Sequence, residues 1–194
     1  HRPQMSCTSR SRSWTTSPAS AGVAHTVNKA DTTVAVGTSG TPSVFGQSVT
    51  FTATITVTSP GAGSPTGNIT FKDNGVDIGT CTAQVVAASA ATCILSNLVV
   101  ATHPITAVYN SDANFNASPA SPVLNQVVNK ANTSVGVTSG GNPSFFGQQV
   151  TFTATVNVTA PGAGTRTGTW SIQSVPSGGG PAGPIVADKL TLTL

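Results

Sequence analysis

The sequence predicts an all-β protein made of tandem antiparallel β-sandwiches, with about 100 residues in each repeat. Composition is the first observation behind this prediction: the 194 residues include no Glu, only six Leu and 31 Thr. Such a chain lacks the usual residues of solvent-exposed amphipathic helices, whereas Thr and Val favour strands. The other two observations are a strict alternation of apolar and polar side chains and an internal repeat of 101 residues.

The alternation is clearest in residues 49–58, which read VTFTATITVT. In a strand this pattern puts Phe51 and Ile55 on an apolar face and the threonines on the opposite face. Residues 150–159 repeat the pattern, with Phe152 in the place of Phe51. Because one buried and one solvated face are typical of an antiparallel sheet, we expect all three side chains to lie in a core.

The dipeptide Asn74-Gly75 predicts a two-residue β-hairpin turn, since both residues tolerate a positive φ angle. This turn sets Phe71 opposite Ile78 on one face of the hairpin, and a Lys opposite an Asp on the other face. An apolar pair and an ion pair therefore support the same register. We assign Phe71 and Ile78 to the core.

Further short strands are predicted where apolar and β-branched residues gather. We expect Tyr109, at the end of one of them, to be a core residue whose hydroxyl bonds to the backbone; stacking on a ligand is the alternative. Phe115 is also expected in the core. Trp14 and Trp170 stand at the repeat positions equivalent to Phe115 and Ile69, so core packing is expected for both, whereas a sugar-binding platform would need an exposed Trp. The further strands cover residues 32–36, 91–95, 105–109 and 123–128. Together with the strands already described, they make six or seven strands in about 100 residues.

The internal repeat predicts how the chain is divided into domains. With an offset of 101, residues 27–67 match residues 128–168 at 27 of 41 positions. This period is too long for solenoid repeats, so each repeat is expected to be a separate domain. We expect the tail of a preceding repeat in 1–26 with an unrelated leader in 1–13, a complete domain in 27–127, and a partial or divergent domain in 128–194.

The charge distribution excludes two classes of partner. The formal net charge is +3, and Arg2, Arg10 and Arg12 alone supply three of the eight cations. Residues 13–194 therefore carry five cations and five Asp, so they are neutral. A protein that binds nucleic acid or anionic lipid needs clustered cations on its folded body. We expect neither a nucleic-acid partner nor membrane insertion, because the chain also contains no run of 18 apolar residues.

Three segments carry a resemblance to a known family: FGQSVTFTAT at 45–54, TGNITFKDNG at 66–75 and AVYNSDANF at 107–115. They resemble the bacterial Ig-like domain repeats of large surface and secreted proteins. The resemblance covers nearly all of 27–127 and also 128–168, whereas 1–13 and 173–194 depart from it. It implies immunoglobulin-like sandwiches, an extracellular location and a stalk or adhesion role without catalytic residues.

Cys81 and Cys93 enclose 11 residues between two predicted strands. In an oxidising compartment we expect them to form a cross-strand disulfide, which would stabilise the fold by about 3 kcal/mol. Two buried free thiols are the alternative. A zinc site would need four ligands, and only His103 follows at a suitable spacing, so no metal site is predicted.

Asp112 opens a D-x-N-x-N pattern like the start of a calcium loop. An EF-hand also needs Gly at position six and Glu at position twelve, where this chain has Ala117 and Val123. We therefore expect a turn in which Asp112 bonds to backbone amides and Phe115 closes the end of the sandwich. Weak calcium binding is the alternative.

The sequence contains no recognisable catalytic constellation. General acid–base catalysis needs paired carboxylates or a His with an orienting acid. The five Asp are scattered along the chain, and His25 and His103 stand alone in or near strands. Neither a nucleophile elbow nor a P-loop is present. We predict no enzymatic activity and no cofactor.

These observations favour a non-catalytic stalk or spacer of tandem Ig-like repeats, on a bacterial cell surface or secreted. The expected partners are neighbouring repeats of the same chain, with a glycan or an extracellular protein as further candidates. A ligand-binding adhesin domain is the first alternative, although the residues that dominate binding hot spots, Trp, Tyr and Arg, are few here. An accessory module of a secreted carbohydrate-active enzyme is the second.

Overall fold

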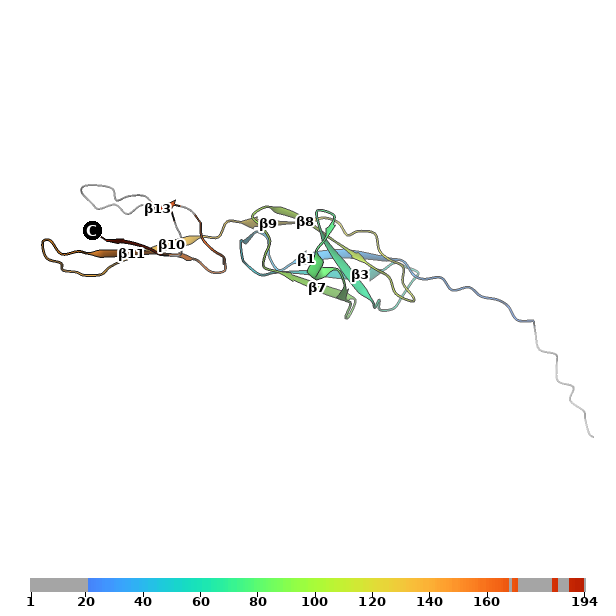
Figure 1. Ribbon diagram of the computed structural model, residues 1–194. Coiled ribbons are helices and arrows are strands. Elements are labelled where there is room, and N and C mark those ends of the chain that lie inside the picture. Colours follow the sequence, from blue (N-terminus) through green and yellow to red (C-terminus); the bar gives the residue numbers. More distant parts are fainter. Residues whose placement is uncertain (1–20, 168, 171–182, 185–188, 194) are drawn as a thin grey trace, which may run out of the picture.

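The computed structural model of the chain describes residues 21–167, 169–170, 183–184 and 189–193. Within these residues every regular element is a strand, apart from the short 3₁₀ turn η1 (Gly79–Cys81), which confirms the all-β prediction. The strands in Figure 1 are β1 (Thr32–Thr38), β2 (Ser43–Val44), β3 (Val49–Val57), β4 (Asn68–Asp73), β5 (Val76–Asp77), β6 (Gln84–Val85), β7 (Ala90–Leu95), β8 (Thr102–Tyr109), β9 (Leu124–Asn129), β10 (Thr133–Ser139), β11 (Thr151–Val158), β12 (Thr169–Trp170), β13 (Gly183–Pro184) and β14 (Lys189–Thr193).

The first sheet has the strand order β1-β3-β7, and both pairings are antiparallel. Phe51 of β3 stands between Thr38 of β1 and Cys93 of β7. The alternation predicted for β3 is present, because apolar side chains of this strand turn inward while Thr54 and Thr56 are exposed. The fully buried side chains of β3 are Val49, Phe51, Ala53 and Ile55.

The second sheet has the order β2-β9-β8-β4-β5, and β6 also pairs with β4. Its pairings are antiparallel except for β2, which runs parallel to β9 with Val44 opposite Asn129. The sequence predicts β4, β5, β8 and β9 but not β2 and β6. Two residues are too few to show an alternation, and β5 is predicted only because the Asn74-Gly75 turn precedes it.

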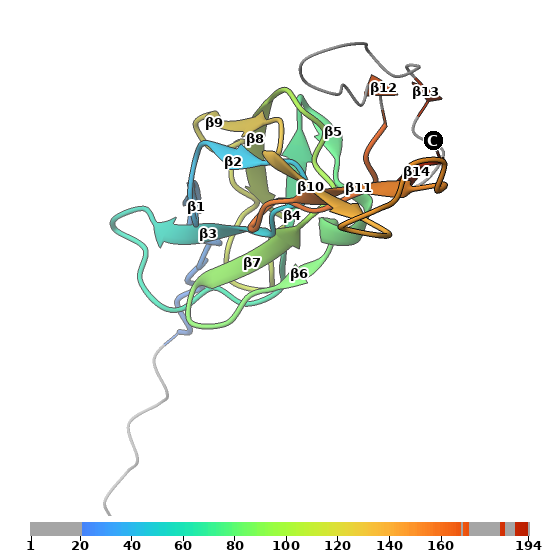
Figure 2. The same cartoon turned by 90° about the vertical axis from the view of Figure 1, so that its left-hand side faces the viewer.

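The two sheets pack face to face around one hydrophobic core (Figure 2). Phe51 from the first sheet and Phe71, Ile69, Ile105 and Tyr109 from the second are 0% exposed. Burial of one such side chain stabilises the fold by about 1.5–3 kcal/mol relative to an exposed one. Ile78 departs from the prediction: it follows the short, exposed strand β5, so it is only half-buried and packs against the rim of the core.

β10, β11 and β14 pair in the same order as β1, β3 and β7 of the first sheet. Every pair between β10 and β11, from Thr133↔Val158 to Ser139↔Phe152, is a pair between β1 and β3 displaced by 101 residues. β14 pairs with β11 as β7 pairs with β3, but its residues come two positions earlier than this offset predicts. The pairing of β14 with β11 thus resembles that of β7 with β3, although the sequence match ends at residue 168. β12 and β13 form a separate two-stranded ladder.

The core assignment of Phe152 is only partly correct. Phe152 is half-buried, whereas its equivalent Phe51 is 0% exposed. On the paired strand β10, Val135 is 61% exposed, whereas its equivalent Val34 is 5% exposed. The reason is that no second sheet covers β10 and β11 within the described residues. A second complete sandwich therefore stays a prediction.

Candidate functional site

A contact between distant parts of the chain holds the 133–158 hairpin at the end of the sandwich (Figure 1). The Ala163 amide donates a hydrogen bond of 3.1 Å to the carbonyl oxygen of Phe45, in the turn after β2. The Phe45 amide donates in turn to the carbonyl oxygen of Asn129, at 2.8 Å. Only residues 130–132 link β9 to β10, and Phe45 thus bonds to backbone on both sides of this link. A contact of this kind restrains bending between the two parts.

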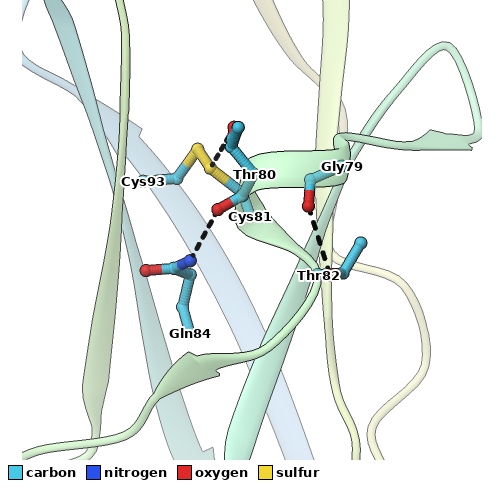
Figure 3. Close-up of a disulfide and its surroundings, with 6 residues drawn as sticks. All are labelled: Gly79, Thr80, Cys81, Thr82, Gln84 and Cys93. Atoms are coloured by element: carbon cyan, nitrogen blue, oxygen red, sulfur yellow. Dashed lines mark hydrogen bonds between the residues drawn. A yellow bond between two sulfur atoms is a disulfide. The ribbon is translucent and has the colours of Figure 1, made fainter.

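Cys81 and Cys93 form a disulfide, with their Cα atoms 5.7 Å apart (Figure 3). Cys93 points into the core from β7. Cys81 lies in η1, so the disulfide does not join two strands, contrary to the prediction. The bond therefore ties the turn that follows β5, in the second sheet, to the edge strand of the first sheet. Gln84 Nε2 supports η1 by donating to the Thr80 carbonyl at 3.0 Å.

The residues of the predicted hairpin lie at the turn between β4 and β5. Asn74 and Gly75 have φ angles of 49° and 79°, as a tight two-residue turn requires. The backbone amide of Ile78 donates to the Phe71 carbonyl at 3.0 Å, and Lys72 and Asp77 form the ion pair on the outer face.

The loop after β8 is organised by Asp112. One carboxylate oxygen accepts hydrogen bonds from the amide and hydroxyl of Thr66, at 2.8 and 2.7 Å. The other accepts from the amides of Asn114 and Phe115, at 2.8 and 2.9 Å. The bonds from Thr66, and then those from Asn114 and Phe115, hold the pKa of Asp112 well below its usual range. Four donors point at this carboxylate, so a calcium ion would have to displace them.

The sandwich pairs β2 parallel with β9 and has a hairpin turn at Asn74, and a comparison with known families identifies the domain. The model of the family described as bacterial Ig-like domain (group 3) matches residues 34–129, just under half of the chain. Residues 34–129 are a bacterial Ig-like domain. The match runs from within β1 to the last residue of β9 and thus covers both sheets of the sandwich. No curated protein matches the chain.

The Ig-like domain contains one His–Asp pair that the sequence analysis missed. Nδ1 of His103 lies 2.6 Å from Oδ2 of Asp73, and Nε2 lies 3.0 Å from the carbonyl oxygen of Val99. The two residues are 30 positions apart and meet because β8 pairs with β4. Burial lowers the pKa of His103, but the bonds to Val99 and Asp73 outweigh it and leave the pKa above its usual 6.5.

This pair is suited to a structural role and not to catalysis. Both partners of the imidazole are hydrogen-bond acceptors, so the ring fits best as the cation that donates from both nitrogens. A general base needs one ring nitrogen with a free lone pair facing its substrate. Bacterial Ig-like domains are generally non-catalytic, which agrees with this geometry.

Three further residues were assigned to the core of an Ig-like sandwich. Tyr109 is 0% exposed and Phe115 is 5% exposed. The Tyr109 hydroxyl has no hydrogen-bond partner among the described residues, so the predicted bond to the backbone is wrong. Burial, and then the Asp112 carboxylate, raises the pKa of Tyr109 to about 12. The backbone of Trp170 lies in β12, but its side chain falls outside the described part, as does Trp14.

A buried polar network surrounds Gln126 of β9, which the sequence did not predict. The Gln126 side chain is 0% exposed, and its Nε2 donates to Gly40 O and Ser43 Oγ, both at 3.1 Å. Its Oε1 accepts from the Thr38 hydroxyl at 2.9 Å, which joins the two sheets at their edge. A single Gln in a strand carries no sequence signal for such a role.

Within the described ranges, no cluster of three His, Cys, Asp or Glu side chains could hold a metal ion. No helix in that part of the chain is long and apolar enough to cross a membrane.

Proposed function

We propose that this chain is a non-catalytic spacer segment of a bacterial extracellular protein, in which Ig-like domains follow one another with little freedom between them. The observation that carries the proposal is the pair of hydrogen bonds at Phe45, whose carbonyl oxygen accepts from the Ala163 amide and whose amide donates to the Asn129 carbonyl. Flexible tethers between independent domains are usually polar and make few contacts. Here, the three-residue link and the contact beside it favour a stiff connection instead.

Two further observations support an extracellular location. The disulfide between Cys81 and Cys93 persists in oxidising compartments and is rare in the cytosol. Bacterial Ig-like domains commonly occur in extracellular proteins.

Residual dipolar couplings of the full chain test the spacer function. The amides of β3 and β8 report the orientation of the sandwich, and those of β10 and β11 report the orientation of the following hairpin. A stiff connection predicts that one alignment tensor fits both sets. Two unrelated tensors of different magnitude would show freely moving beads and contradict the proposal.

Direct adhesion is the alternative to the spacer function, and a binding experiment tests it. Among the described residues, the exposed aromatic side chains are Phe45, Phe145 and Phe146, and all three lie in turns or loops between strands. Specific binding of the full chain to a glycan or matrix-protein array, lost in a Phe145→Ser/Phe146→Ser variant, would favour an adhesin over a spacer.

A further inference from the structure

The turn at Phe45, which contacts the loop after the 133–158 hairpin, has a shape that only glycine fits at position 46. Gly46 has a φ angle of +81°, and a Cβ added there would lie 2.6 Å from the Ala163 carbonyl oxygen. The turn is closed by Gln47, whose amide donates to the Val44 carbonyl while its side chain accepts from the Val44 amide, both at 3.0 Å. The contact with Ala163 is thus a close approach of backbone to backbone.

The same turn occurs again at the far end of the hairpin, without a partner. Gln148 donates to the Phe145 carbonyl at 3.0 Å and accepts from the Phe145 amide at 2.9 Å, and Gly147 has a φ angle of +80°. Nothing lies within 4 Å of a Cβ added at Gly147, and the Phe146 side chain is fully exposed. This second turn is already shaped for the contact that Phe45 and Gly46 make.

The receiving loop also occurs twice. Ala62 is the equivalent of Ala163, and the neighbouring glycines Gly61 and Gly162 make the same contacts: each amide donates to a Thr carbonyl three residues earlier, at 3.0 and 3.1 Å. The Ala62 amide is exposed and has no hydrogen-bond partner among the described residues, whereas the Ala163 amide bonds to Phe45. A surface hollow lined by Asn28, Ala62 and Phe115 adjoins this loop.

The segment that leads into the sandwich, residues 21–29, also lacks neighbours that its equivalent later in the chain has. Val27 is 83% exposed, whereas its equivalent Val128 in β9 is 3% exposed. Val128 is buried because β9 pairs with β8 and β2, and residues 21–29 make no such pairing within the described part. Val128 is covered by β8 and β2, and Ala163 by the turn at Phe45. The same elements of a preceding copy would cover Val27 and Ala62.

We propose that both free ends couple to further copies of this domain: the Phe146-Gly147 turn contacts the loop of a following copy, and the Ala62 loop receives the turn of a preceding copy. The inference rests on the proposed spacer function and names the surface through which it acts. In the observed contact the Phe45 ring lies against Gly164, where an added Cβ would lie 2.7 Å from Cε1. At the equivalent Gly63 the ring of Phe115 already takes this place, with an added Cβ 3.2 Å from its Cζ. The coupling at this end is therefore carried by the backbone of the turn and not by insertion of a phenylalanine ring.

Such a contact needs a shared polypeptide. One backbone hydrogen bond contributes only about 0.5–1.5 kcal/mol, which is too little to hold free chains together. A three-residue link raises the local concentration of one surface at the other, so the same contact forms within a chain. The surfaces on the two ends differ, so the coupling is head to tail and extends in one direction.

The test is a chain with one more copy, in which residues 1–127 are followed by residues 27–194. This join reproduces the natural sequence at 125–131. The experiment measures amide hydrogen exchange of Ala62 in both copies. We expect exchange at least about tenfold slower in the second copy, where Phe45 of the first copy can accept the hydrogen bond, than in the first.

Two glycine variants of the extended chain provide a matched pair. Gly46→Ala in the first copy should return Ala62 of the second copy to fast exchange, because the added Cβ blocks the approach. Gly147→Ala imposes the same strain at nearly the same φ angle but faces nothing, so it should leave the slow exchange unchanged. Equal exchange of both Ala62 amides, or loss of protection in both variants, would overturn the inference.

Small-angle scattering of the same chain separates this inference from the spacer function. An elongated, stiff particle with two rapidly exchanging Ala62 amides would reject the proposed surface but keep the spacer. A freely flexing particle with two rapidly exchanging amides would reject both.

Discussion

His103 and Asp73 form a partly buried ion pair across β8 and β4, with Nδ1 of the imidazole 2.6 Å from Oδ2 of the carboxylate. The pair closes the end of the sandwich beside the disulfide turn, where Asp73, Thr80 and His103 line one surface hollow. The second ring nitrogen bonds to the Val99 carbonyl, so the imidazole is held from both sides. Both bonds favour the protonated ring.

The raised pKa of His103 predicts that the sandwich loses stability as the pH rises. The contribution is fully present below about pH 6.5, where the unfolded chain also binds the proton, and is lost as the pH rises through the folded-state pKa. Urea unfolding, followed by NMR signals of β3 and β8 between about pH 6 and pH 9, measures it. A His103→Gln variant should lack this decline. Parallel pH profiles of the two proteins would refute the imidazolium assignment.

Removal of the disulfide should destabilise the Ig-like domain by about 3 kcal/mol, because a loop of this length loses its constraint in the unfolded chain. The double variant Cys81→Ala/Cys93→Ala tests this by denaturant unfolding of the oxidised proteins. Cys7→Ala is the control, since Cys7 lies outside the described residues and should leave the β3 transition in place. A loss below about 1 kcal/mol would mean that the rest of the core holds η1 without the bond.

Asp112→Asn should lower the melting temperature of the sandwich more than Asp77→Asn. Both changes remove one negative charge, but Asp112 accepts four hydrogen bonds in its loop, whereas Asp77 forms a surface ion pair with Lys72. Because the pKa of Asp112 is lowered on folding, its contribution to the stability of the sandwich also depends on pH. This contribution is fully present above the usual carboxyl pKa and is lost as the pH falls toward the much lower folded-state pKa. Thermal unfolding by circular dichroism compares the two variants. Equal losses would show that the four bonds contribute no more than the ion pair.

Native-state hydrogen exchange should be faster in β11 than in the equivalent strand β3. Phe152 is half-buried and Val135 is largely exposed, so this hairpin buries less apolar surface than its counterpart around Phe51. The comparison uses paired amides 101 positions apart, which have similar neighbours in sequence. Equal protection of the two strands would contradict this expectation.

The elements that the sequence predicted have a local signal. Residues 49–58 alternate over ten positions, and Asn74-Gly75 is a turn with its own conformational preference, so each specifies its geometry without reference to the rest of the chain. Strands of two residues, such as β2, have no such signal. The Tyr109 hydroxyl and the half-buried Ile78 were misjudged for a related reason: the face of a residue follows from periodicity, whereas its partner and its depth depend on what packs against it.

Spacing along the chain is enough to predict the all-β class, the inward face of β3, the register of the β4–β5 hairpin and the offset of 101 between the β1–β3 and β10–β11 pairs. Pairing and packing of segments far apart in the chain bring His103 to Asp73, Gln126 to Thr38 and Gly40, and the turn at Phe45 to Ala163. These contacts join residues 30 to 118 positions apart. Such pairs come together only once the sheets have formed and packed, so no local pattern announces them.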